Sequence, residues 1–293
     1  DQLTAAYQEV ILTTARPADP AHVVRKLYWD RAAPGGRLDE YYGGRDFLIA
    51  DGLIDVPVSR LDTYTLYVNG RRHHLDWVAT LRWLRAHFAA TEPVWAALTQ
   101  GVPTPSSGNS ASLAILAKKV IVEINLAQPL AWFDYDTAGM NSIPGEFANF
   151  LWYASALGGW LVPTYNPTAF ADHPATFARV PDNTPEIRRA DIEHTTSTLH
   201  IDYAPRLADT RRAAVTTYWN QLVRPVADRL WPGADLANLL RPYLAMRILG
   251  VYNLADLAPP DRLALLARLA EAMSPAFDPA TYFCPLESPC PAP

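Results

Sequence analysis

The segment AWFDYDTAG, residues 131–139, carries the most specific chemical pattern in the chain and guides the assignment of its fold. Two carboxylates, Asp134 and Asp136, follow an apolar run and precede a glycine turn. In an extended strand, side chains two residues apart point to the same face. Paired carboxylates at the end of a strand suit a divalent cation or a proton transfer. The competing interpretation is turn chemistry, in which each aspartate caps local backbone groups.

The composition of the chain is that of a globular protein. Of its 293 residues, 49% are hydrophobic and 19% are charged, a mixture that can bury a core. This length predicts one large domain or two smaller ones. The formal net charge of −5 does not favour a nucleic-acid partner. No run of about 18 apolar residues predicts a membrane span. We therefore expect neither nucleic acid nor membrane as a partner.

Cysteine usage gives an expectation about the compartment. Cys284 and Cys290 both lie in the proline-rich segment 281–293, so no disulfide framework holds the main body. We expect a reducing, cytoplasmic location and a loose tail over 281–293. The chain starts at Asp1 and shows no charged-then-apolar signal pattern, which suggests a trimmed sequence rather than a secreted one.

The first seventy residues have mainly strand-like patterns. β-Branched and alternating residues predict strands at 10–16, 22–29, 56–62 and 63–70. The last two are expected to form a hairpin, and Asn69–Gly70 to end its second strand. A helix weakened by Gly43–Gly44 is expected within 37–52.

Patterns with helical spacing dominate the rest of the chain. Helices are predicted at 75–90, 148–162, 186–199, 209–231, 235–250 and 260–273. The change from strand period to helix period falls at Asn69–Gly70–Arg71. It divides the chain into a β-rich N-terminal lobe at 1–70 and a helical lobe at 71–280, followed by the proline-rich tail.

The order of these elements and motifs resembles the protein-kinase-like fold, in its aminoglycoside phosphotransferase-like branch. In that family a strand lysine, held by a helix glutamate, contacts nucleotide phosphates, and Lys26 and Glu40 stand at the similar places. A strand aspartate that binds magnesium matches Asp134. A second acid about twelve residues later matches Glu146 in PGEFANFLW. The resemblance implies an α+β bilobal fold with a small antiparallel-sheet N-lobe and a mainly helical C-lobe. It also implies ATP and magnesium as cofactors.

The catalytic loop departs from the family pattern H-G-D-x-x-x-x-N. The similar segment here is Gln100–Gly101–Val102 followed by PTPSSGN, so valine stands where the family has its catalytic aspartate. Asn109 lies two residues beyond the place of the family's asparagine. The resemblance then leaves Asp134 and Asp136 as the catalytic candidates, with Asp136 taking over the role of the base. Asp134 and Asn109 are the candidate metal ligands.

Two functions from different classes follow from this pattern. In the first, the protein is a divergent phosphotransferase that acts on a small hydroxylated or amino-sugar-type metabolite. In the second, it is a non-catalytic kinase-like protein, or pseudokinase, whose cleft binds a metabolite, a nucleotide or a protein partner. A general base typically accelerates a reaction about 10²–10⁴-fold. Because Val102 cannot accept a proton, it argues against an efficient ordinary kinase. The kept spacing of Asp134 and Glu146 favours a metal or loop-bracing role.

Two groups of histidines were weighed as further sites. His73–His74 follows the NGRR turn, and adjacent strand side chains point to opposite faces, so a surface turn is favoured over a metal site. The set of His194, His200 and Asp202 matches no standard zinc spacing. Substrate contact is an alternative for it.

The substitution Asp134→Ala tests the predicted metal site. We expect it to abolish magnesium-dependent ATP binding, because the metal loses its carboxylate ligand, and to leave the fold intact. Calorimetric titration with ATP, with and without magnesium, measures the first effect, and circular dichroism checks the second. Normal binding of magnesium-ATP by the variant would remove the assignment of Asp134.

Overall fold

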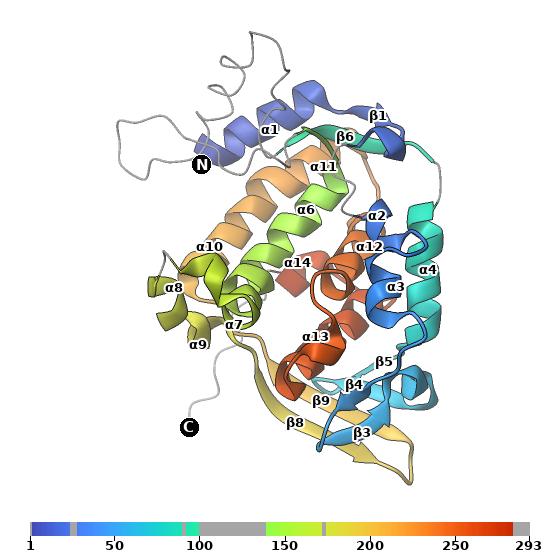
Figure 1. Ribbon diagram of the computed structural model, residues 1–293. Coiled ribbons are helices and arrows are strands. Elements are labelled where there is room, and N and C mark those ends of the chain that lie inside the picture. Colours follow the sequence, from blue (N-terminus) through green and yellow to red (C-terminus); the bar gives the residue numbers. More distant parts are fainter. Residues whose placement is uncertain (1, 24–27, 90–91, 100–138, 172–173, 284–293) are drawn as a thin grey trace.

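The computed structural model describes residues 2–23, 28–89, 92–99, 139–171 and 174–283. In this part of the chain a body of helices lies between a three-stranded and a four-stranded sheet (Figure 1). A further hairpin of β2 (Leu48–Ala50) and β3 (Ile54–Pro57) lies next to the larger sheet. The protein is therefore α+β, as the sequence predicted.

The helical body combines long and short helices. The longer ones are α1 (Gln2–Thr14), α4 (Trp77–Ala89), α6 (Ile143–Trp152), α10 (Asp209–Tyr218), α12 (Leu236–Leu249) and α13 (Pro259–Met273). The shorter ones are α2 (Trp29–Ala32), α3 (Arg37–Tyr42), α7 (Val162–Tyr165), α8 (Pro174–Ala178), α9 (Val180–Asn183), α11 (Arg224–Leu230) and α14 (Pro279–Phe283). The 3₁₀ segments are η1 (Pro20–His22), η2 (Val58–Thr63), η5 (Pro167–Phe170) and η7 (Leu254–Asp256).

Two π-helical segments continue long helices. The segment η4 (Tyr153–Leu161) joins α6 to α7, and η6 (Trp219–Val223) joins α10 to α11. The widened turns of η4 leave carbonyl oxygens that Arg211 binds, because its guanidinium donates to Ala154 O at 3.2 Å and Gly158 O at 2.7 Å. Such segments are costly unless the freed carbonyls find donors.

The helices predicted at 75–90, 235–250 and 260–273 are confirmed as α4, α12 and α13. Local signals explain two of them. The Asp235 carboxylate accepts from the backbone N–H of Ala237 at 2.8 Å and caps the start of α12. Pro259 and Pro260 stand at the start of α13, where their missing N–H groups cost nothing.

The smaller sheet joins the N-terminal segment to the segment that leads into α6. Its strands are β1 (Arg16–Ala18), β6 (Val94–Thr99) and β7 (Gly139–Ser142), with β6 in the centre and both pairings antiparallel. Ser142 then caps α6, because its hydroxyl oxygen accepts from the N–H of Gly145 at 3.3 Å.

The larger sheet brings together strands that are far apart in the sequence. Its order is β5 (Arg71–His73), β4 (Thr65–Val68), β9 (Thr198–Ala204) and β8 (Glu186–Glu193). The pairing of β4 with β9 is parallel, and the other two pairings are antiparallel. Alternate residues of β4 and β9 are buried, and both strands pack on α13. Burial on one face therefore fixes the register.

A strand ends at Asn69–Gly70 as predicted, and these two residues form the turn between β4 and β5. Both residues have positive φ, 51° for Asn69 and 72° for Gly70. This is the geometry of the two-residue turn that Asn-Gly favours. The partner of β4 in the hairpin is β5, however, and not the segment 56–62.

The strand prediction for 10–16 is wrong, because most of this segment belongs to α1. The hydroxyl of Thr13 donates to Glu9 O at 2.7 Å, and that of Thr14 donates to Val10 O at 2.6 Å. These bonds satisfy the hydroxyls inside the helix, and Ile11 is fully buried. Tertiary burial thus overrides the β-propensity of these residues.

Two further predictions of secondary structure are corrected. The helix predicted at 186–199 is a hairpin of β8 and the start of β9, with Ser197 at a φ of 50° in its turn. The two strands pair in antiparallel register, and the alternation of β8 is interrupted at Arg188–Arg189, where the register shifts. The strand predicted at 56–62 is mostly η2. Val58 and Leu61, three residues apart, are both buried, as the three-residue turn of a 3₁₀ helix requires.

The bilobal kinase-like arrangement is not confirmed. The larger sheet joins β4, from the expected lobe 1–70, to β8 and β9, from the expected lobe 71–280. The smaller sheet likewise joins β1 to β6 and β7. Of the segment 22–29, predicted as a strand, residues 24–27 lie outside the described residues and Trp29 starts α2. The division at residue 70 and the tail at 281–293 stay predictions.

A buried arginine in α13 connects β2, from the N-terminal part of the chain, to the loop before α13. Arg262 is only 3% exposed. Its guanidinium donates to Leu48 O at 2.6 Å, at the start of β2. It also donates to three carbonyls of the loop before α13, at 2.8 to 2.9 Å: Leu254, Ala255 and Leu257. One side chain thus satisfies four backbone carbonyl oxygens.

The substitution Arg262→Met tests this connection. It keeps the apolar stem but removes every donor, and an unsatisfied buried acceptor costs about 1–3 kcal/mol. We expect the free energy of unfolding to fall by about 3–5 kcal/mol in urea titrations followed by circular dichroism. Arg229→Met, at an exposed position of α11, is the matched control and should change it by less than about 0.5 kcal/mol. Equal effects of the two substitutions would contradict the role of Arg262.

Candidate functional site

The residues that the sequence assigned to nucleotide and metal lie mostly outside the described residues. This is so for Lys26, Asn109, Asp134 and Asp136. Glu40 is described, and it is exposed in the first turn of α3. The expected pairing of Glu40 with Lys26 therefore stays a prediction.

Asp39, next to Glu40, makes contacts that position α3. Its carboxylate accepts from the N–H of Gly35 at 2.8 Å and from the guanidinium of Arg85, on α4, at 2.7 Å. Of this acidic pair, Asp39 thus links α3 to α4, whereas Glu40 faces solvent.

Glu146 is buried in the first turn of α6, with 5% of its surface exposed. The hydroxyl of Tyr7, on α1, donates to its Oε1 at 3.4 Å. A carboxylate near a helix N-terminus is favoured by the helix dipole. Glu146 therefore links α1 to α6, and its relation to Asp134 is not described.

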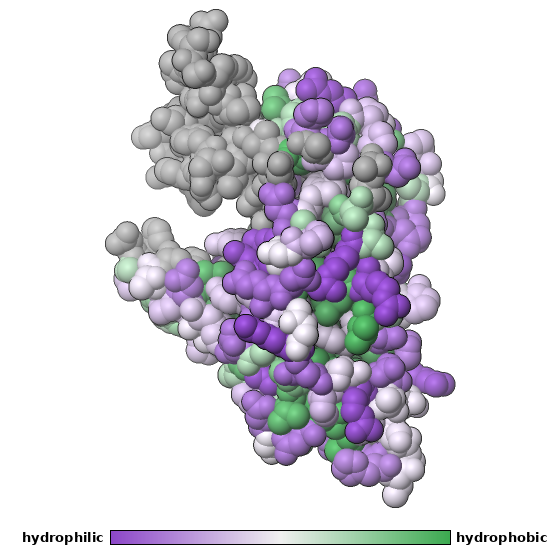
Figure 2. Space-filling view, turned by 45° about the vertical axis from the view of Figure 1, so that its right-hand side comes forward, coloured by the Kyte–Doolittle hydropathy of each residue, from purple (hydrophilic) through white to green (hydrophobic). Residues whose placement is uncertain are grey.

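The exposed apolar side chains of the described residues do not mark a binding surface. The large apolar side chains that are exposed in the described part of the chain come from four segments, and only Val78 and Trp83 share one, α4. They are Leu53, Val78, Trp83, Tyr153 and Phe177. On the face shown in Figure 2, apolar residues are interspersed with polar ones. A ligand site is better sought in a cavity.

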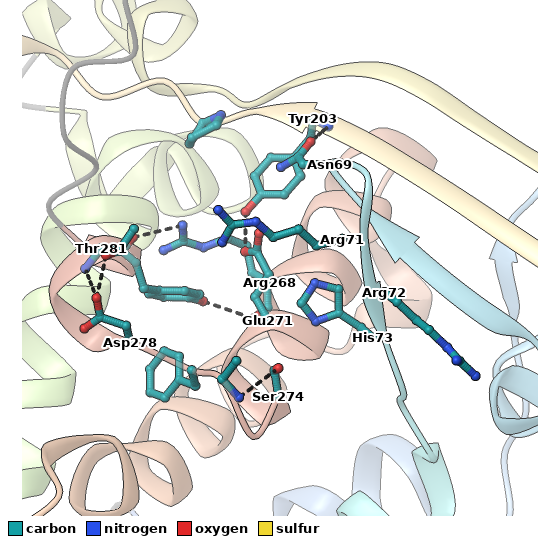
Figure 3. A pocket seen from close by; sticks show the side chains of 14 residues that line it. Asn69, Arg71, Arg72, His73, Tyr203, Arg268, Glu271, Ser274, Asp278 and Thr281 are labelled. Atoms are coloured by element: carbon teal, nitrogen blue, oxygen red, sulfur yellow. Dashed lines mark hydrogen bonds between the residues drawn. The ribbon is translucent and has the colours of Figure 1, made fainter.

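A pocket of about 460 Å³ lies where the β4–β5 hairpin meets α13 and α14 (Figure 3). This volume is in the range of small-molecule sites. The lining residues are Asn69, Arg71, Arg72, His73, Tyr203, Pro205, Arg268, Glu271, Ser274, Ala276, Phe277, Asp278, Thr281 and Tyr282. Polar and charged groups converge there on three aromatic rings, of Tyr203, Phe277 and Tyr282, and on Pro205.

The hairpin supplies one wall of the pocket. In β5, Arg71 and His73 extend to one side, whereas Arg72 borders the pocket but its side chain points away (Figure 3). This is the alternation of a strand. The hairpin is held in place because the backbone N–H of Tyr203 donates to Asn69 Oδ1 at 2.8 Å.

The floor of the pocket is a network around Arg268 of α13. Its guanidinium lies 3.5 Å from the centre of the Tyr282 ring and donates to Tyr282 O at 3.3 Å. The Tyr282 hydroxyl donates to Arg268 O at 3.2 Å. The hydroxyl of Tyr203 donates to Glu271 Oε2 at 2.6 Å. Cation–π and hydrogen bonds thus fix the positions of these side chains.

The opposite wall is the loop between α13 and α14. Asp278 caps α14, because its carboxylate accepts from the N–H of Ala280 at 3.0 Å and from the hydroxyl of Thr281 at 2.5 Å. Arg241 braces the loop from α12, donating to Ser274 O at 3.1 Å and lying 5.8 Å from the centre of the Phe277 ring.

The network keeps Arg268 charged and the tyrosines neutral. Burial alone would lower the pKa of Arg268, but the surrounding Tyr282, Tyr203 and Glu271 outweigh it and raise that pKa. Burial raises the pKa of Tyr203 and that of Tyr282. The two phenols therefore act as hydrogen-bond donors and not as bases at neutral pH.

His73 is a neutral group in this wall. Both of its ring nitrogens are buried, and neither has a hydrogen bond of ordinary geometry in the described part of the chain. Burial lowers its pKa, with a smaller effect of Arg71 in the same direction. The Glu271 carboxylate and the nearby Ala270 carbonyl oppose the shift.

Arg71 has no acidic partner among the described residues. No ion pair within 4.0 Å involves it there, although Glu271 and Asp278 line the same pocket. Within the described part of the chain, its guanidinium is therefore available to an anion from solvent.

The histidine groups considered as metal sites gain no support, whereas the site of Asp134 and Asn109 lies outside the described residues. In residues 2–23, 28–89, 92–99, 139–171 and 174–283, no group of three His, Cys, Asp or Glu side chains is placed to hold a metal ion. His200 instead stacks on Tyr67, with ring centres 5.3 Å apart. No helix of the described part combines the length and apolar character needed to cross a membrane.

Sequence reasoning missed the pocket. It treated the residues after Asn69–Gly70 as a surface turn, although a strand after such a turn places Arg71 and His73 on one face. No comparable signal marks Arg268 and Glu271. They lie three residues apart in a helix, a spacing that many surface pairs share.

Comparison with known proteins adds no relative. No protein family, no curated protein and no solved structure matches the chain.

The buried His73 predicts a pH dependence of stability. Its pKa is lower in the folded than in the unfolded chain, so the unfolded chain binds more protons as the pH falls through the ordinary range of histidine. Its contribution to stability is therefore complete at neutral pH and is lost towards pH ~5. We expect His73→Gln to flatten the decline of the unfolding free energy between about pH 7 and 5.

The matched control is His74→Gln, at the exposed neighbouring position. It should leave the slope of unfolding free energy against pH as in the wild type. His87, whose pKa is also lowered by burial, is unchanged in both variants. Identical slopes in all three proteins would contradict the role of His73.

Proposed function

We propose that the protein binds a small organic anion in the pocket between β5, α13 and α14. The observation that carries this proposal is Arg71, whose guanidinium extends into the pocket without an acidic partner among the described residues. A guanidinium presents paired N–H donors that match a carboxylate or a phosphate.

Three properties of the pocket support a specific ligand over a loosely held ion. The Asn69–Tyr203 hydrogen bond fixes the hairpin that carries Arg71. Arg268 adds a second, rigid positive charge on the floor. Phe277 and Pro205 supply apolar lining for the remainder of an organic molecule. A preformed cavity that combines positioned polar groups with apolar lining is typical of metabolite sites.

The phosphotransferase function remains a second proposal. The observation that favours it is Glu146, an acid buried at the start of the helix that follows the segment of Asp134. In the family that the sequence resembles, an acid at this place holds the loops of the active site in position, and a carboxylate at Glu146 suits that role. Its ATP and magnesium would be held by residues outside the described part of the chain. Titration of the Asp134→Ala variant with ATP and magnesium decides it independently of the pocket.

Substitution of Arg71 tests the proposed anion site. The probes are 3-phenylpropionate, phenyl phosphate and L-phenylalanine, which join a carboxylate or phosphate to a small aromatic group. We expect saturable binding of at least one of them in calorimetry. Arg71→Gln should weaken it at least about tenfold, because a charge-assisted hydrogen bond contributes about 1.5–3 kcal/mol.

Arg72→Gln is the matched control, since it removes the same charge from the adjacent residue whose side chain points away. It should change the affinity by less than about threefold, the size of a screened surface effect. The proposal fails if none of the three probes binds, or if the two substitutions weaken binding equally.

A further inference from the structure

The pocket contains the carboxylate of Glu271, which one hydrogen bond holds in place and which keeps acceptor sites open. Glu271 Oε2 accepts from the Tyr203 hydroxyl at 2.6 Å. Its other oxygen has no hydrogen-bond partner among the described residues, and Glu271 lines the pocket. A carboxylate has about four acceptor sites, so one bond leaves most of them open.

Arg71 and Glu271 face the same pocket but do not neutralise each other. No ion pair within 4.0 Å joins them. Arg71 comes from the hairpin wall, whereas Glu271 comes from α13, where Tyr203 holds its carboxylate. Opposite charges on two walls of one pocket, of which Glu271 is held by Tyr203, favour a ligand that carries both complementary charges.

The rest of the pocket decides between ligands of this kind. A dicarboxylate or a phosphorylated acid would bring a second negative charge towards Glu271, and the repulsion would offset the attraction that Arg268 exerts from the floor. An ammonium group there instead gains a charge-assisted hydrogen bond. The apolar lining of Phe277, Ala276 and Pro205 is suited to a hydrocarbon or aromatic substituent.

We propose that the ligand is a free α-amino acid with an apolar or aromatic side chain. Its carboxylate binds Arg71, and its ammonium group binds the open oxygen of Glu271. The side chain lies against Phe277 and Pro205. This inference rests on the proposed anion site and names the class of ligand that the site takes. No bond is made or broken.

The test compares L-phenylalanine with two analogues that each lack one charged group. These are 3-phenylpropionate, without the ammonium group, and 2-phenylethylamine, without the carboxylate. We expect L-phenylalanine to bind the wild-type protein at least tenfold more tightly than either analogue in calorimetry. Glu271→Gln should remove most of its advantage over 3-phenylpropionate, and Arg72→Gln should leave that advantage unchanged.

The outcomes separate this inference from the anion site. Binding of 3-phenylpropionate as tight as that of L-phenylalanine overturns the amino-acid class and leaves the anion site standing. A preference for L-phenylalanine that Glu271→Gln does not reduce overturns the assignment of Glu271. Failure of every carboxylate and phosphate probe overturns both proposals. The comparison of the three compounds on the wild-type protein decides the ligand class even if Glu271→Gln does not fold.

Discussion

The fold depends on the burial of one guanidinium. Arg262 lies in the helical core, and a buried charge is tolerated only when its donors are satisfied. Its partners are backbone carbonyls of β2 and of the loop before α13, together with the exposed Asp51 carboxylate at 3.6 Å. These segments must therefore stay in place for the charge to be stabilised. The early part of the chain is thereby attached to α13. The larger sheet and the pocket are both built on that helix.

The pairing of β4 with β9 connects α13, on which both strands pack, to the hairpin that lines the candidate site. The parallel pair between residues 65–68 and 198–201 joins segments far apart in the sequence, as parallel strands require a long connection. It fixes the hairpin whose second strand holds Arg71 and His73. The hydrogen bond from Tyr203 to Asn69 connects the same two segments by a side chain. The pocket is therefore a product of tertiary structure more than of any single motif.

Local signals in the sequence predicted the elements that depend on local chemistry. The Asn69–Gly70 turn and the helices with caps or starting prolines were found, because their signals act within a few residues. The segments 10–16 and 186–199 were misassigned, since burial of Ile11 and pairing with β9 outweigh local preference. Of the site residues expected from the resemblance, only Glu40 and Glu146 are described. No motif marks the pocket, because its lining comes from three distant segments and its charged groups from two of them, 71–73 and 268–278.

The distance in sequence between those segments has a consequence for folding equilibria. The pocket draws on residues 69–73, 203–205 and 268–282, so it is absent from any state in which one of them is detached. A molecule that binds there shifts the balance between folded and unfolded chains by mass action, and the stabilisation grows with the logarithm of its concentration. The whole chain then reports occupancy of the pocket through its resistance to heat and proteolysis. In the cell, the lifetime of the protein would follow the supply of its ligand.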